Sequence, residues 1–137
     1  MKLWTRVSWS LIAAALIGSV NANAQRSPSR EGGVPVVEVV GCLVSAPNDT
    51  WVLTSGSDPV ISTRPSTTTE AVQAAAARPL GTQRYRLLGL AAFRPAEHAG
   101  HKMVVKGLLI KDQKETRVNV TSFQMAAAGC EATSGNK

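Results

Sequence analysis

The sequence contains few of the side chains on which enzymes and metal centres depend. Only two of its 137 residues are histidine, two are cysteine and 4% are aromatic. The histidines share one run with a carboxylate, Glu97-His98-Ala99-Gly100-His101, whereas a metal centre needs three or four ligands. No Ser-His-Asp set or pair of carboxylates suited to acid–base chemistry stands out. We therefore expect no catalytic residue, no metal and no cofactor, and we predict that the protein is not an enzyme.

The chain also lacks an apolar run long enough to span a membrane. Its longest candidate, residues 11–20, has about half of the ~20 residues that a spanning helix needs. Basic Lys2 and Arg6 precede this run and Asn21-Ala22-Asn23-Ala24 follows it, which is the order of a secretory signal peptide. We expect residues 1–24 to be cleaved near Ala24. The mature protein would then be periplasmic or secreted, without a transmembrane anchor.

Charge and aromatic content are low once this signal is removed. Loss of Lys2 and Arg6 lowers the 15 basic residues to 13 against nine acidic ones, and the net charge from +6 to +4. Trp51 and Tyr85 both alternate in phase with leucine, so they are expected to point into the core. Single-stranded nucleic acid is bound by stacking on exposed aromatics. The sequence therefore disfavours nucleic acid as a partner.

Two cysteines in an exported chain most simply form one disulfide. Cys42 and Cys130 are far apart, so their bridge would close a long loop and contribute about 4–5 kcal/mol in the chain-entropy model. Val39-Val40-Gly41-Cys42 has the letters of a lipoprotein cleavage box, but a polar, proline-containing segment precedes it. A redox pair is normally close in sequence, as in Cys-x-x-Cys. We predict a structural Cys42–Cys130 disulfide.

Five stretches have the composition and alternation of β-strands, separated by polar turns. Valine occupies both faces of the first, which predicts a strand covered on both sides over part of its length. Gly107 inside the fourth indicates a bulge or sharp bend. We predict a small all-β domain over residues 36–130, closed as a barrel that removes exposed edges. The predicted strands are residues 36–44, 50–55, 84–90, 103–111 and 117–125.

Residues 56–83 form a long insertion between the second and third predicted strands. Thr67 and Glu70 fit a capping box ahead of an alanine-rich run that Pro79 ends, which predicts a short helix. The alanines offer little apolar area to bury, so composition slightly favours a mobile loop instead. Residues 25–35 and 131–137 are expected to be flexible polar tails.

Several short motifs recur in the order found in one group of small secreted bacterial domains. They are Gly41-Cys42-Leu43, Trp51-Val52-Leu53-Thr54, Tyr85-Arg86-Leu87-Leu88-Gly89, Gly100-His101-Lys102-Met103-Val104-Val105-Lys106-Gly107, Val118-Asn119-Val120-Thr121-Ser122-Phe123 and Cys130. On these residues the chain resembles that group, which resembles an OB-type five-stranded β-barrel and has no assigned activity. Met103, where valine is usual, and the long insertion depart from the pattern. The resemblance implies a fold and no activity.

A basic surface is the main candidate for function. Arg84 and Arg86 alternate with apolar residues and should share one strand face, and Lys106 and Arg117 could extend them into a patch. On an OB barrel the second and third strands commonly face the ligand. The plainer interpretation is a solvated basic face without a partner.

Three functions are compatible with these features. We favour a monomeric, non-enzymatic envelope binding module, whose ligand would be an anionic polymer, a small molecule or a protein held on a rigid scaffold. A structural or inhibitory protein acting through residues 56–83 is the second interpretation. A nucleic-acid-binding OB domain is the third.

Overall fold

The computed structural model describes residues 34–130. The predicted signal peptide at 1–24, the tail at 131–137 and most of the tail at 25–35 lie outside the described residues. None of the helices within residues 34–130 has the length and apolar character that crossing a membrane requires. The elements, in chain order, are β1 (Val36–Ala46), β2 (Thr50–Gly56), β3 (Val60–Ile61), α1 (Thr69–Ala77), β4 (Gln83–Leu88), η1 (Ala91–Phe93), η2 (Pro95–His98), β5 (Lys102–Lys111) and β6 (Thr116–Ala127).

The strands form a single sheet in the order β2-β4-β6-β5-β1-β3, and β1 also pairs with β2. The pairings therefore run through five strands and return to β1. Only β4 and β6 are parallel neighbours, and the other pairs are antiparallel. All five predicted strands are present, and the all-β prediction is confirmed. The sixth, β3, was not predicted because two residues are too short to show a period.

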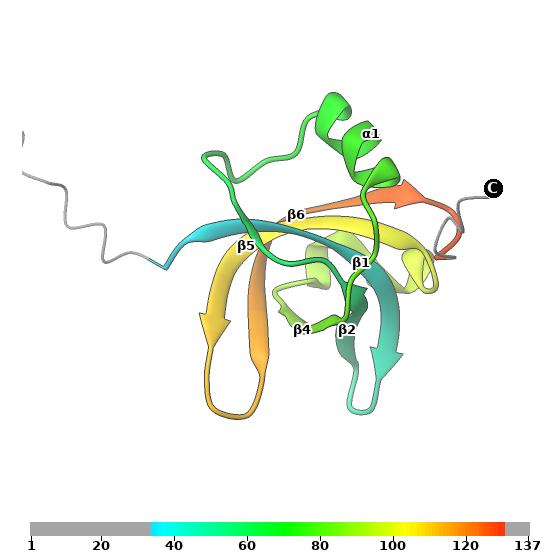
Figure 1. Cartoon of the computed structure of the whole chain (residues 1–137). Coiled ribbons are helices and arrows are strands. Elements are labelled where there is room, and N and C mark those ends of the chain that lie inside the picture. The colour runs from blue at the N-terminus through cyan, green and yellow to red at the C-terminus, as the bar shows by residue number, and fades with distance from the viewer. Residues whose placement is uncertain (1–33, 131–137) are drawn as a thin grey trace, which may run out of the picture. The chain divides into compact units, whose positions relative to one another are not determined.

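Figure 1 shows α1 on the side of the sheet away from the β1–β2 and β5–β6 turns. The main core packs against one face of the sheet and includes Val37, Val39 and Leu43, which alternate along β1. A smaller cluster on the outer side joins Val40 of β1 and Val104 of β5 to α1. Both faces of β1 are thus covered, as its two rows of valine predicted.

Gly107 marks a bulge between β5 and β6, as predicted. The pairing register shifts between Lys106 and Gly107. A β-carbon at this position would collide with the backbone carbonyl of Asn119, so only glycine lets the two strands approach so closely. The bulge bends β5 and increases its local twist, which helps β5 to pair with both of its neighbouring strands.

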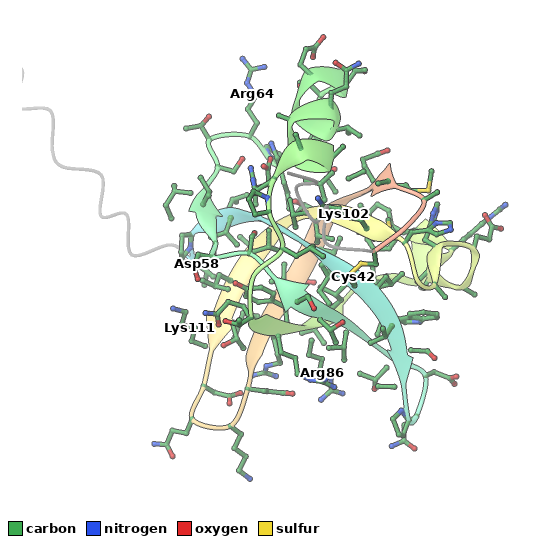
Figure 2. All side chains as sticks on the ribbon, turned by 45° about the vertical axis from the view of Figure 1, so that its right-hand side comes forward. Cys42, Asp58, Arg64, Arg86, Lys102 and Lys111 are labelled. Atoms are coloured by element: carbon green, nitrogen blue, oxygen red, sulfur yellow. A yellow bond between two sulfur atoms is a disulfide. The ribbon has the colours of Figure 1, made fainter. Side chains whose placement is uncertain are left out.

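Lys102 fastens the end of α1 to the sheet, and Figure 2 shows it beneath that end of the helix. Its side chain is buried, with the residue 5% exposed, and its ammonium donates to the carbonyls of Ala76 (2.8 Å) and Arg78 (2.6 Å). These carbonyls belong to the last turn, whose acceptors have no partner inside the helix. Burial, and then the charge of Arg78, lowers the pKa of Lys102 below its ordinary value.

Lys106 fastens the irregular segment that precedes α1. It is 7% exposed and donates to the carbonyl of Ser66 at 2.9 Å. Its ammonium also lies 3.5 Å from the carboxylate of Glu38, which pairs with Arg78 at 2.6 Å. The two buried lysines therefore hold the insertion at both ends of α1.

The slight preference for a mobile insertion is wrong, and the short helix is present. Thr68, not Thr67, caps it and accepts from the amide of Ala71 at 3.2 Å. Thr67 instead forms a hydrogen bond to Ser122 of β6 at 2.7 Å. The composition of the insertion indicates only that the helix has little apolar area to bury. Hydrogen bonds from polar side chains on distant strands hold the segment in place.

The disulfide joins Cys42 of β1 to Cys130 beyond the end of β6, which confirms the predicted pairing. The cysteines are 88 positions apart and their Cα atoms are 5.6 Å apart. Cys42 lies where β1 changes neighbour, because it pairs with Thr54 of β2 on one side and Lys102 of β5 on the other.

The first prediction concerns Tyr85, the single tyrosine of the chain. It is 2% exposed and donates to the carbonyl of Ser57 at 2.8 Å. Burial, and then the charge of Asp58, raises the pKa of Tyr85 to about 12. The folded state keeps a proton that the unfolded state begins to lose near pH 10, so stability falls as the pH rises from about 10 towards 12. Ultraviolet titration should show tyrosinate forming near pH 12 in the native protein, and a native midpoint near 10 would contradict the burial.

The second prediction concerns Lys102. Lys102→Met leaves two helix-end carbonyls without their donor, which should loosen the end of α1 by about 1–3 kcal/mol. Hydrogen exchange measured by mass spectrometry should become faster in residues 69–78. Lys111→Met is the matched control, because Lys111 is an exposed lysine at the end of the same strand. Equal exchange in both variants would show that Lys102 does not hold the helix.

Candidate functional site

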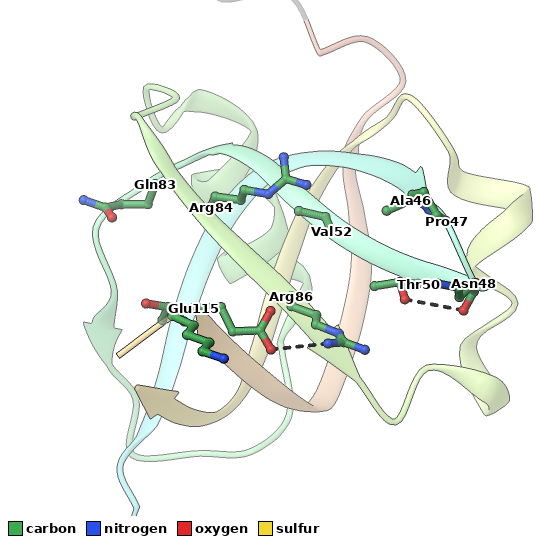
Figure 3. A pocket seen from close by; sticks show the side chains of 11 residues that line it. Ala46, Pro47, Asn48, Thr50, Val52, Gln83, Arg84, Arg86 and Glu115 are labelled. Carbon is green, nitrogen blue, oxygen red and sulfur yellow. Dashed lines mark hydrogen bonds and ion pairs between the residues drawn. The ribbon is translucent and has the colours of Figure 1, made fainter. Parts of the chain in front are cut away.

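An open groove crosses the outer face of β2 and β4, with the β1–β2 turn on one side and the β5–β6 turn on the other (Figure 3). Its volume is about 620 Å³. The face is not covered by α1, which lies over β1, β5 and β6. The groove is lined by Ala46, Pro47, Asn48, Thr50, Val52, Gln83, Arg84, Arg86, Lys114, Glu115 and Thr116.

Alternation along β4 puts two arginines in this groove. Tyr85 and Leu87 are buried in the main core, so Arg84 and Arg86 between and beside them point to the opposite face. Val52 is the register partner of Arg86 on β2 and forms an apolar floor beside it. The guanidiniums are thus presented from a rigid strand rather than from a loop.

The two arginines have different surroundings. None of the ion pairs among residues 34–130 involves Arg84, which is exposed. The side chain of Arg86 is 44% exposed and its guanidinium lies 3.3 Å from the carboxylate of Glu115. An ion pair this exposed contributes at most about 1 kcal/mol. A ligand anion can therefore displace the Glu115 carboxylate at little cost.

The β5–β6 turn is organised by Asp112. Its carboxylate accepts hydrogen bonds from the amides of Lys114 (2.8 Å) and Glu115 (3.0 Å) and from the guanidinium of Arg117 (2.9 Å). The two amide bonds are the main reason that the pKa of Asp112 is lowered. These bonds fix the wall of the groove that presents Lys114 and Glu115.

The β1–β2 turn forms the opposite wall. Asn48 (φ 62°) and Asp49 (φ 52°) both adopt left-handed backbone conformations. Asparagine and aspartate tolerate this region better than other non-glycine residues, and two such residues in succession suit a tight hairpin. The hydroxyl of Thr50 donates to the carbonyl of Asn48 at 3.4 Å. The predicted turn is therefore confirmed.

The structure divides the predicted basic patch of Arg84, Arg86, Lys106 and Arg117. Arg84 and Arg86 line the groove, and Arg117 is the register partner of Arg86 across the parallel β4–β6 pair. Arg117 is not among the residues that line the groove, and its guanidinium is paired with Asp112 at 2.9 Å and lies 3.7 Å from Glu115. Lys106 is not part of this surface. The insertion covers it, and only the tertiary structure shows where the insertion lies.

The contribution of the two turns to the groove could not be predicted from the sequence. Pro47, Asn48, Lys114 and Glu115 were assigned to turns but not to a site. Their proximity depends on β4 lying between the β1–β2 and β5–β6 hairpins. No local pattern carries that information.

The histidine-containing segment has a packing role. The ring of His98 lies 5.7 Å from that of Phe123 and 5.9 Å from that of His101, in edge-on geometry. Across residues 34–130, no three histidine, cysteine or acidic side chains come together as a metal-binding group would.

No family model, curated protein or solved structure matches the chain.

The third prediction tests the turn that forms one wall of the groove. Asp112→Ala removes the acceptor of two amides, so the Lys114 and Glu115 amide protons should exchange faster with solvent. Lowering the pH should likewise reduce the protection of these two amides relative to their intrinsic exchange rate at each pH, because the contribution of Asp112 is full above about pH 4 and is lost as the pH falls through its lowered pKa. Resolved amide exchange by NMR is the measurement. Gln113→Ala, in the same turn, should change neither amide, and identical exchange in the two variants would contradict the assignment.

Proposed function

We propose that the protein is an exported, non-enzymatic binding module with an OB-type five-stranded barrel, which holds an anionic ligand in the groove across β2 and β4. The observation that carries this proposal is the convergence of both arginines, two turns and an apolar floor at one uncovered surface.

The strand order supports an OB-type barrel. Without the two-residue β3, the strands in chain order are β1, β2, β4, β5 and β6, and their pairings run β1-β2-β4-β6-β5 and back to β1. This order matches the five-stranded Greek-key arrangement of the OB-fold. The β1–β2 and β5–β6 turns then correspond to the first and last inter-strand loops of that fold.

The position of the groove supports a binding role. In OB-folds, oligonucleotides and oligosaccharides bind on the second and third strands between the first and last loops. The groove occupies the corresponding strands, β2 and β4, between the corresponding turns. A sheet with rigid hairpin turns is the kind of scaffold that usually carries binding residues.

The side chains of the groove favour an anion. Arginine offers a planar fork of donors that matches carboxylate and phosphate oxygens. Arg84 is exposed and Arg86 is held only by a weak, displaceable pair with Glu115. Lys114 adds a third positive charge from the turn.

Two features support export. The signal-peptide pattern of residues 1–24 and a disulfide are both typical of proteins in oxidising compartments such as the periplasm. We propose this compartment as the place where the groove meets its ligand.

The fourth prediction is the test of this function. Arg84→Glu with Arg86→Glu should weaken binding to heparin and polygalacturonate by at least roughly 100-fold, because two charged hydrogen-bonding groups are lost at about 1.5–3 kcal/mol each. Calorimetric titration at several salt concentrations measures the effect. Binding by the unaltered protein should weaken with salt, and the double variant should show a smaller dependence.

The matched control is Arg64→Glu with Arg94→Glu, which makes the same change in net charge on exposed arginines outside the groove. It should bind nearly as well as the unaltered protein. Equal losses in the two double variants would show that net charge, not the groove, attracts the polymer. Failure of the unaltered protein to bind either polymer would exclude the proposal.

A further inference from the structure

A second hollow adjoins the groove at Arg86. It has a volume of about 360 Å³ and lies between the β1–β2 turn and the segment that follows β4. Asn48, Thr50 and Arg86 line both hollows, so the two meet along these three residues. Together they form one continuous track across the sheet rather than a single compact cavity.

The second hollow is more apolar than the first, and Trp51 lies in its wall. Trp51 is half-buried, and it packs partly against the main core. Leu88, Ala91 and Pro95 line the same hollow. Trp51 was predicted to point inward, and its packing against the core confirms this. Its presence in the wall of the hollow was not predicted.

The track thus has a cationic part in the groove and a more apolar part, which includes an aromatic side chain, in the second hollow. Arg84 and Arg86 provide donors for anionic groups, and the part of Trp51 that is not packed on the core provides an aromatic contact in the wall of the second hollow. A linear ligand that fits it must carry an anionic group close to an apolar ring face. The open ends of a surface track suit a chain of repeating units.

We propose that the ligand is an acidic oligosaccharide, with a sugar carboxylate on Arg84 or Arg86 and the next sugar ring against Trp51. This inference rests on the proposed binding function of the groove. A sugar acid has carboxylate oxygens at its edge and C–H groups on its ring faces, so it matches both parts of the track in one repeating unit.

Charge and aromatic content favour a sugar acid over single-stranded nucleic acid. Nucleic-acid grooves combine many phosphate-neutralising cations with several stacking aromatics. Here two buried lysines are engaged by the insertion, and Trp51 is the only aromatic that lines either hollow among residues 34–130. An acidic ligand with a single ring contact fits this surface better than a strand that stacks several bases.

The fifth prediction uses Trp51 as its own reporter. In the full chain with Trp4→Phe and Trp9→Phe, Trp51 is the sole tryptophan. Tetragalacturonate should change its fluorescence saturably. Galacturonate monomer should bind at least about tenfold more weakly because it cannot span both hollows, and neutral maltotetraose should bind more weakly still because it lacks the anion.

Trp51→Phe, studied by calorimetry, should keep a folded core and lower tetragalacturonate affinity several-fold. Phe93→Leu is the control, because Phe93 also packs on the core but lies outside both hollows. Native thermal melting and the tyrosinate titration of Tyr85 check that each variant is folded.

The outcomes separate this inference from the function on which it rests. Binding that needs Arg84 and Arg86 but leaves Trp51 fluorescence unchanged would overturn the oligosaccharide track and leave the anion groove intact. Tighter binding of an oligothymidylate of equal charge than of the uronate would overturn the ligand class. Absence of binding to every anionic probe would reject the groove itself.

Discussion

Strand β1 pairs with more strands than any other strand described. Its first part pairs with β5 on one edge and with β3 on the other, and its second part pairs with β2. The change of neighbour falls at Gly41 and Cys42. A β-carbon at Gly41 would collide with the side chain of Leu53 and the carbonyl of Thr54, so the strands can only cross this closely at glycine. The disulfide is attached at the next residue, and it ties this crossing to the end of the last strand.

The same arrangement separates structural polar groups from those that are free to bind. The outer side of β1, β5 and β6 is covered by the insertion, and the charges of Lys102 and Lys106 are used there. The outer side of β2 and β4 is left open, and its arginines face the groove. Basic side chains covered by the insertion therefore have a structural role, whereas those on the uncovered face remain accessible to solvent.

Much of the fold could be predicted because its determinants are local. Alternation found the five long strands, Gly107 marked the bulge, and the count of cysteines gave the disulfide. The ordered conformation of the insertion was not predicted, because the residues that anchor it come from strands distant in the sequence. Composition alone gives no information about a lysine side chain that binds the end of a helix. The burial of Lys106 was missed for the same reason.

The candidate site, too, could be predicted only where its determinants are local in the sequence. Arg84 and Arg86 were found because neighbouring residues on one strand share a face at every second position. Lys114, Glu115 and Asn48 were not, because turns far apart in sequence come to flank the same two strands only in the folded sheet. Trp51 shows a different limit. Alternation assigns a side chain to one face, but a large indole can pack on the core and still form part of a surface wall.

The contact between Arg86 and Glu115 has one more consequence. The groove already contains a carboxylate of its own, tethered at high local concentration beside the guanidinium that a ligand would use. Small free anions such as acetate or chloride must compete with it singly and gain little. A polymer that engages Arg84 at the same time gains a contact for which Glu115 does not compete. For the binding function proposed above, the internal carboxylate would therefore favour ligands that engage both arginines over small single anions.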